Sequence, residues 1–356
     1  MQKYFDIEFW RRVTYVDVTL WLMRAAVIIV VVWGTIGTLI DGRYSNEQWF
    51  DFVMFGLTMG GIYALVALGY TMVYGILRLI NFAHGDIFMT GAFTAYFVAS
   101  PLGKSGFLEE NLLISMIIIC LTAMVTCVII ALTVERICYR PFRSVRSFAP
   151  LICAIGASFF IQHSFRGMYG SSVRAYPDVE FFDKLLSIGS FDFPMIQPVV
   201  ILAALGSMTG LYLIVMKTRM GTAMRATSED RDTASLMGID VNRVIIFTFV
   251  LGGSMAGIGG VLYAFVFKQV YFFMGFFPGI KAFSAAVLGG IGNIPGAMLG
   301  GFFLGTVESV GPALFLDGLG IVAPYQLRDL IAFTMLVMVL IFRPQGLLGE
   351  RVSQRA

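Results

Sequence analysis

The stretch KTRMGTAMRATSEDRDTASLMGIDVNRV, from Lys217 to Val244, is a charged island between two long apolar segments of this 356-residue chain. The segments Ile196–Met216 and Val244–Phe267 each approach the ~20 apolar residues that cross a bilayer. Within the island, the spacing of MRATSEDRDTASLMGI predicts a short amphipathic helix that could dock a partner. The residues available for its apolar face are Met224, Ser228, Ala234, Leu236 and Met237.

The composition is that of an integral membrane protein. Hydrophobic residues make up 58% of the chain and charged residues 13%, against about 45–50% and about 25% in a soluble domain. A net charge of +3, spread over short loops, does not indicate a nucleic acid partner. The cysteines form no CxxC pair, so we expect buried small side chains and no metal site. They are Cys120, Cys127, Cys138 and Cys153.

The apolar segments predict a polytopic, all-α bundle of about 8–10 transmembrane segments that includes broken or re-entrant helices. The 39 glycines of the chain favour close helix packing. We expect membrane lipid to surround the bundle. The predicted spans are Leu20–Ile40, Phe50–Leu77, Phe82–Ala99, Leu112–Val134, Ala149–Met168, Ile196–Met216, Val244–Phe267 and Leu327–Phe342, with a Gly-rich region at Ala282–Leu316.

The distribution of Lys and Arg predicts the orientation. If the N-terminus is cytoplasmic, 17 of the 25 basic residues fall on the inner side, five of them in the island. Because cytoplasmic loops carry an excess of Lys and Arg, this places the N-terminus, the island and the C-terminus in the cytoplasm.

This orientation constrains the Gly-rich region. Residues Lys281 to Leu316 must then begin and end on the outer side, although Ala282–Leu288 is too short to span the bilayer alone. The middle of the region, AVLGGIGNIPGAMLGG, favours two half-helices with a break at Gly289–Gly296. The alternative is one long helix bent at Pro295, which would require another predicted span to be wrong.

Polar residues at membrane depth are candidates for a translocation path, because ionisable groups there are costly. His84 and Asp86 lie in the hinge RLINFAHGD, and Glu308 lies in FFLGTVESVGPALF. A compatible alternative is that Asn81 and Asp86 cap the start of the third span. The candidate path residues are Asn81, His84, Asp86, Gly289, Gly290, Gly292, Asn293 and Glu308.

Enzyme motifs are missing from the sequence. It holds no GxxxxGK[ST], GxSxG or HExxH, and GGIGNIPG has Pro295 where a GxGxxG loop needs its third glycine. We therefore expect no catalytic residue and no metal ligand. If ATP drives transport, another subunit must hydrolyse it.

Four long motifs resemble the bacterial ABC transporter permeases for branched-chain amino acids, the Liv type. The similarity covers about Phe50 to Glu350, and NFAHGD and RPFRS make it closer to the LivH-like member of the permease pair than to the LivM-like one. The motifs are GLTMGGIYALVALGYTMVYGILRLINFAHGDIFMTGAF (Gly56–Phe93), RATSEDRDTASLMGIDVNRVIIFTFVLGGSMAGIGGVLYA (Arg225–Ala264), AFSAAVLGGIGNIPGAMLGGFFLGTVES (Ala282–Ser309) and FRPQGLLGE (Phe342–Glu350).

The resemblance implies a bacterial inner-membrane permease with several partners. These are a homologous LivM-like permease, two cytoplasmic ABC ATPases that bind ATP and Mg²⁺, and a periplasmic or extracellular substrate-binding protein. No cofactor is expected on this chain. SEDRDTASLMGI matches the coupling helix that the ATPases grip, except that Asp230 stands where the family pattern has alanine. The residues assigned to ATPase coupling are Arg225, Glu229, Asp230, Ala234 and Gly238.

The predicted organisation has three parts: an extension at residues 1–48 with an extra span, a permease core at 49–350 with its coupling loop at about 217–243, and a cytoplasmic tail at 351–356. Related permeases handle urea, short amides or other neutral amino acids, so these cargoes stay open beside branched-chain amino acids. A self-contained channel or secondary transporter is the rival outside the ABC class.

Overall fold

The chain folds as a polytopic helical bundle, which confirms the predicted fold class. The computed structural model describes residues 14–143, 148–189, 191–343 and 345–349, so the start of the predicted extension and the tail 351–356 lie outside the described residues. Seven helical segments there are long and apolar enough to cross a membrane. They are Tyr15–Asp41, Asn46–Leu77, Leu112–Phe142, Ile196–Lys217, Val241–Phe267, Ile294–Leu319 and Pro324–Phe342.

The helix bounds follow the predicted spans closely, because uninterrupted apolar runs are the strongest signal in a membrane sequence. The span Leu112–Val134 agrees at both ends, whereas α3 begins at Asn46, four residues before the predicted start. The helices are α2 (Tyr15–Asp41), α3 (Asn46–Leu77), α4 (His84–Lys104), α5 (Phe107–Glu110), α6 (Leu112–Val134), α7 (Ala149–Tyr169), α8 (Glu180–Asp183), α9 (Ile196–Lys217), α10 (Arg219–Glu229), α11 (Arg231–Leu236), α12 (Val241–Phe267), α13 (Phe276–Gly289), α14 (Ile294–Gly311) and α15 (Arg328–Phe342).

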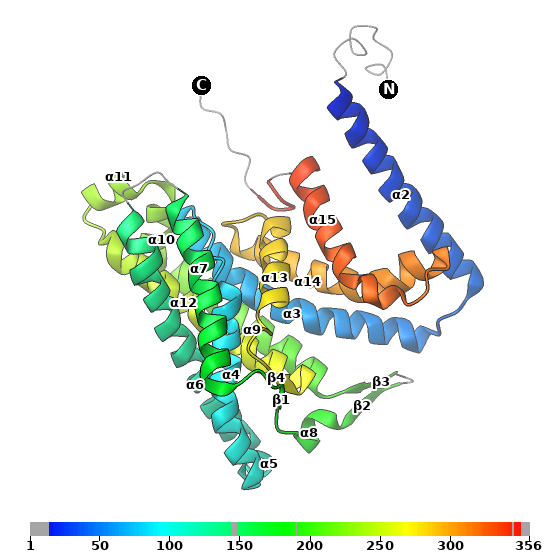
Figure 1. Cartoon of the computed structure of the whole chain (residues 1–356), viewed down its shortest axis with the longest axis horizontal. Coiled ribbons are helices and arrows are strands. Elements are labelled where there is room, and N and C mark those ends of the chain that lie inside the picture. Colours follow the sequence, from blue (N-terminus) through cyan, green and yellow to red (C-terminus); the bar gives the residue numbers. More distant parts are fainter. Residues whose placement is uncertain (1–13, 144–147, 190, 344, 350–356) are drawn as a thin grey trace.

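Helix α3 is the centre of the bundle. It packs against α14, α12, α13 and α9, and Figure 1 shows it running through the molecule between these elements. Gly301 and Gly305 of α14 lie directly against the backbone of α3 at Ala64 and Gly60. Small residues permit this approach, which gives van der Waals contact where lipid provides no hydrophobic drive between helices.

A second layer forms where α12 packs against α6 and α4. The buried thiol of Cys127 on α6 donates a hydrogen bond of 3.0 Å to the carbonyl of Ile87 on α4. Cys138 is also buried, while Cys120 and Cys153 are partly buried, and all four are free thiols. The cysteines therefore serve as small packing residues, as predicted.

The Gly-rich region forms a helical hairpin. Helix α13 ends at Gly289 and α14 begins at Ile294, and the two helices pack against each other. The contact is so close that a methyl group on Gly300 would lie 2.2 Å from the carbonyl oxygen of Ala285. The predicted break is confirmed, and the alternative of one long helix bent at Pro295 is wrong. The expectation of two half-helices holds for α13 alone, since the helical segment Ile294–Leu319 is long and apolar enough to cross a membrane.

Two small sheets depart from the expectation of helices alone. Strand β2 (Leu185–Ile188) pairs with β3 (Phe191–Pro194), and β1 (Arg174–Ala175) pairs with β4 (Gln269–Val270), both antiparallel. In Figure 1 the β2–β3 hairpin lies far from α10 and α11. Below, the end of the bundle that carries α10 and α11 is called the island end, and the opposite end, which carries the β2–β3 hairpin, is called the hairpin end.

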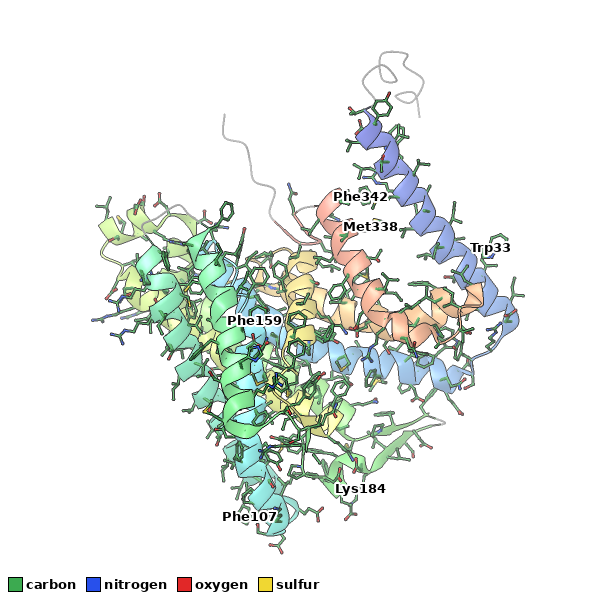
Figure 2. The ribbon with its side chains drawn as sticks, in the orientation of Figure 1. Trp33, Phe107, Phe159, Lys184, Met338 and Phe342 are labelled. Atoms are coloured by element: carbon green, nitrogen blue, oxygen red, sulfur yellow. The ribbon has the colours of Figure 1, made fainter. Side chains whose placement is uncertain are left out.

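Helix α2, the extra span, stands largely apart from the bundle (Figure 1). It packs mainly on the turns Pro312–Leu316 and Asp317–Leu319 that follow α14, and the guanidinium of Arg24 lies 3.8 Å from the ring centre of Phe342 on α15. Figure 2 shows Trp33 of α2 on one side and Met338 and Phe342 of α15 on the other. Most of the α2 surface is therefore available to lipid or to another chain.

We predict that Gly301→Ala destabilises the permease, because its new methyl group would lie 2.5 Å from the Cα of Ala64. Overpacking of this kind costs about 1–3 kcal/mol. Thermal unfolding of the purified chain in detergent measures the effect. Gly206→Ala on α9 is the matched control, since no atom lies within 4 Å of the added methyl group; equal stability of the two variants would contradict the packing argument.

Candidate functional site

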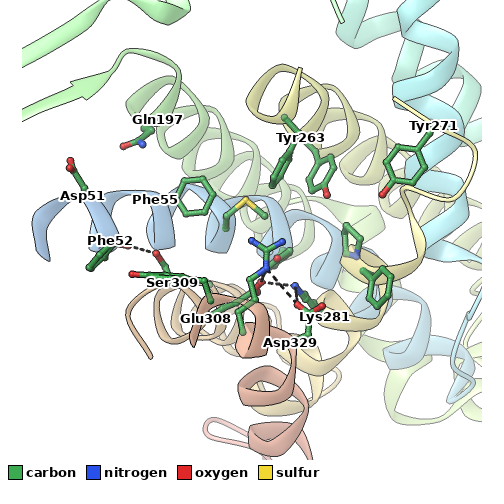
Figure 3. A pocket seen from close by; sticks show the side chains of 18 residues that line it. Asp51, Phe52, Phe55, Gln197, Tyr263, Tyr271, Lys281, Glu308, Ser309 and Asp329 are labelled. Carbon is green, nitrogen blue, oxygen red and sulfur yellow. Dashed lines mark hydrogen bonds and ion pairs between the residues drawn. The ribbon is translucent and has the colours of Figure 1, made fainter. Parts of the chain in front are cut away.

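A cavity of about 520 Å³ lies at the hairpin end of the bundle. Its walls come from α3, α9, α12, α13, α14 and α15, and Figure 3 shows side chains from these helices converging on it. Its volume falls within the roughly 300–1,000 Å³ of small-molecule sites. Of the predicted path residues, only Glu308 lines this cavity.

Four charged side chains form a network on one wall of the cavity. The ammonium of Lys281 lies 2.5 Å from Oε1 of Glu308 and 2.6 Å from Oδ1 of Asp329. The Nε of Arg328 lies 3.8 Å from the same two oxygens. Two cations therefore face two anions, and the network joins α13, α14 and α15 (Figure 3).

The inner pair of this network is deeply buried. The side chains of Lys281 and Glu308 are only 5% and 7% exposed, whereas that of Arg328 is 47% exposed. Oε2 of Glu308 is buried, and the side chain of Tyr63 hydrogen-bonds to this carboxylate. Because a carboxylate oxygen accepts more than one hydrogen bond, this buried atom is a candidate ligand-binding atom.

The remaining cavity wall is largely apolar and aromatic. Phe52, Phe55 and Met59 of α3 line it together with Phe267 and Phe277, and Asp51 and Gln197 add polar groups. The cavity thus combines one charged wall with a surface suited to an apolar side chain.

The hinge residues Asn81, His84 and Asp86 are buried but lie outside this cavity. The carboxylate of Asp86 accepts hydrogen bonds from Ser158 and, at 2.8 Å, from Gln162 of α7. It does not cap α4, so that part of the capping hypothesis is wrong: the α7 side chains supply its partners. Asn81 does not cap α4 either: its Oδ1 accepts from the amide of Ala83, 3.2 Å away, the residue that precedes the helix.

The break between α13 and α14 lies at the island end. Gly290 and Gly292 have φ angles of +106° and +96°, a backbone region in which glycine is favoured. Oδ1 of Asn293 accepts from the amide of Gly296 at 3.0 Å and caps α14, while its Nδ2 donates to the carbonyl of Leu348 at 2.9 Å. The amide of Leu348 also donates to the carbonyl of Gly289. Residues 345–349 therefore cover the break between α13 and α14.

The island forms two short helices, α10 and α11, tied to the bundle by arginines. Nε of Arg231 donates to the carbonyl of Ile76 at the end of α3, 2.9 Å away, and Arg78 donates to the carbonyl of Ser228 at 3.0 Å. Arg225 donates to the carbonyl of Val215 on α9. The inner face of the island is therefore fastened to the ends of α3 and α9.

Four of the five predicted coupling residues of the island are exposed: Arg225, Glu229, Asp230 and Gly238. Ala234 is buried, and Asp230 caps α11. Hydrogen bonds from the backbone and side chain of Thr233 lower the pKa of Asp230, so its carboxylate stays ionised at neutral pH.

The predicted apolar face of the island is divided. Met224 and Ala234 pack inward, whereas the side chains of Leu236 and Met237 are 87% and 79% exposed. These two residues therefore do not bury themselves within this chain. Exposed apolar side chains on a polar segment are typical of a docking surface.

Lys281, Arg328 and Asp329 are site residues that the sequence reasoning missed. Lys281 lies inside an apolar stretch, FFPGIKAFSAAVLGG, and Arg328 and Asp329 open the last span. Charged residues inside or beside apolar segments were the signal that could have identified them. Their position at span boundaries is equally typical of side chains that reach to the membrane surface, so the sequence alone does not place them together.

The family model and the curated relatives below point to one family. The family model described as branched-chain amino acid transport system / permease component matches residues 52–340. The high-affinity branched-chain amino acid transport system permease protein BraD of Pseudomonas aeruginosa is 38% identical over 298 residues, 83% of this chain and 94% of BraD. LivH of Escherichia coli K12, described in the same words, is 38% identical over 316 residues, 86% of this chain and 96% of LivH. The solved structure of PsaBC from Streptococcus pneumoniae in complex with Fab aligns with 86% of this chain and 95% of its own at 16% identity and a TM-score of 0.42.

Asn293→Ala should loosen the closure over the helix break, because it removes both the cap of α14 and the bond to Leu348. Loss of an N-cap costs about 0.5–2 kcal/mol. Asn293→Asp keeps the acceptor for the Gly296 amide and loses only the donor to Leu348. Thermal unfolding should rank the native chain above Asn293→Asp and that variant above Asn293→Ala; identical unfolding of all three would show that the closure contributes nothing.

Proposed function

This chain belongs to the family of branched-chain amino acid transport system permease components, and on that premise we propose that it is the permease subunit of an ATP-driven importer for branched-chain or related neutral amino acids. The cargo is inferred from the names of its relatives and from the cavity, whose apolar wall suits an aliphatic side chain. A bilayer-spanning bundle with a cavity at one end and a charged island at the other fits this role.

The arrangement of the island carries the proposal. Its inner face is hydrogen-bonded to the end of α3 through Arg231 and Arg78, while Leu236 and Met237 project outward. A protein that grips the outer face would therefore move the end of α3, and residues of the same helix line the cavity. We assign α10 and α11 the role of the coupling helix.

The partners follow from what this chain lacks. Its sequence has no GxxxxGK[ST] stretch, so we assign ATP and Mg²⁺ to two cytoplasmic ABC ATPases docked on the island. A homologous LivM-like permease would complete the membrane unit, and a substrate-binding protein would deliver cargo at the hairpin end. In this assembly the island end faces the cytoplasm of a bacterial inner membrane, and we expect both termini to be cytoplasmic as well.

Substitution of the outer face should uncouple the transporter. We expect Leu236→Asp, Glu229→Gln and Gly238→Ala each to lower substrate-stimulated ATPase activity and uptake about tenfold, since loss of a central interface contact costs more than about 1 kcal/mol. The amount of permease in the membrane should not change. Assays on the co-expressed complex in proteoliposomes measure all three quantities.

Leu185→Asp is the matched control for the coupling variants. Leu185 is 66% exposed, as an apolar side chain on β2 at the opposite end of the bundle. The control should retain the ATPases in a pull-down, whereas Leu236→Asp should lose most of them. Normal coupling in the island variants would refute the assignment, and gradient-driven flux by the purified chain alone would support a self-contained transporter.

Cysteine labelling tests the orientation. In a background without the native cysteines, a membrane-impermeant maleimide should label Lys184→Cys in intact cells and Met237→Cys only after permeabilisation. The excess of Lys and Arg at the island end is the physical reason for this expectation. Labelling of Met237→Cys in intact cells, with Lys184→Cys protected, would reverse the topology.

A further inference from the structure

We propose that the charged network of Lys281, Glu308, Arg328 and Asp329 is a transient binding site for the α-amino and α-carboxylate groups of a zwitterionic amino acid inside the permease. This inference rests on the proposed function and deepens it, because it gives the permease its own recognition of the amino acid backbone, separate from that of a binding protein.

The network offers one free group for each charge of a zwitterion. Oε2 of Glu308 is buried, and the carboxylate keeps acceptor capacity beyond its bond with Tyr63, so it can accept from a substrate ammonium. The guanidinium of Arg328 is half exposed, and its ion-pair contacts to described residues are long, 3.8 Å from Nε to Glu308 and to Asp329, so its fork can receive a carboxylate. Lys281 pairs with both Glu308 and Asp329 and holds these two carboxylates in place.

The balance of charge also favours a zwitterion. Two cations and two anions give the network no net charge, and an amino acid adds one charge of each sign. The exposed carboxylate of Asp51 also lines the cavity. A net ion bound beside the buried pair of Lys281 and Glu308 would leave an uncompensated charge there, which is costly. Urea or a short amide carries no charge to match either free group, so the network argues against these cargoes.

The cavity places an aliphatic side chain next to the charged wall. Phe52, Phe55 and Met59 belong to one helix, α3, and face the same space as Lys281. The ammonium of Lys281 also lies 5.8 Å from the ring centre of Tyr63, which marks the boundary between the charged and apolar walls. A branched-chain amino acid can therefore satisfy both walls at once.

The first measurement asks whether the complete complex, with its binding protein and ATPases, imports L-leucine into proteoliposomes. Failure here would overturn the proposed cargo. The second uses the same complex without the binding protein and compares three probes by thermal stabilisation at millimolar concentration: L-leucine, 3-methylbutylamine and 4-methylpentanoate. A ligand that binds only the folded state raises the unfolding temperature by mass action.

For the native complex, we expect L-leucine to stabilise more than either analogue, each of which lacks one charged group. Arg328→Gln should weaken leucine binding about tenfold or more, so that leucine no longer stabilises the complex more than 3-methylbutylamine does. Glu308→Gln should instead abolish the advantage of leucine over the carboxylate. These opposite changes in preference would not arise from a network that only holds helices together.

Lys268→Gln provides the matched control. Lys268 pairs with Asp178 and Asp183 at 2.8 Å at the same end of the bundle, but it does not line the cavity. This variant should keep the native preference. Because Arg328 is half exposed, Arg328→Gln keeps the test valid even if Glu308→Gln fails to fold.

Two outcomes would overturn the binding site while leaving the proposed function intact. One is leucine import by the complete complex without any leucine-dependent stabilisation of the permease complex. The other is a loss of stability in Arg328→Gln and Glu308→Gln with an unchanged order of preference among the three probes, which would assign the network a structural role alone.

Discussion

A backbone-to-backbone contact between α3 and α14 supports the rest of the structure. Because Gly301 and Gly305 carry no side chain, α14 lies directly on α3 at Ala64 and Gly60. This contact fixes α3 as a shared strut: its first half lines the cavity, and the carbonyl of Ile76 near its last turn receives Arg231 from the island. The two ends of the molecule are thus connected by one well-packed helix, which suits the transmission of a movement.

Much of the fold follows from the sequence because a bilayer imposes simple rules. Helices must satisfy their own backbone groups in lipid, so uninterrupted apolar runs such as Leu112–Val134 become helices with the predicted bounds. The break at Gly289–Gly296 was equally accessible, since glycines and a proline follow Ala282–Leu288, an apolar run too short to span the bilayer alone. The β2–β3 hairpin was not, because four-residue strands outside the membrane leave no clear periodicity.

The candidate site was predictable only in part, because its members meet through tertiary structure. Glu308 could be selected as an acid at membrane depth, yet its partner Lys281 is 27 residues away and approaches only when α13 and α14 fold into a hairpin. Asp86 illustrates the same limit. Its position at the start of a helix predicted a cap, but its carboxylate accepts a hydrogen bond from Gln162 on α7, 76 residues away.

The closure over the helix break has a consequence for biosynthesis. Asn293 donates to Leu348, a residue 55 positions later in the chain, and a polypeptide emerges from the ribosome in sequence order. The hairpin of α13 and α14 must therefore enter the membrane with its turn unsealed, and it acquires its latch only after α15 has crossed. The hydrogen bonds that cover the break can thus form only once residues 345–349 have been synthesised.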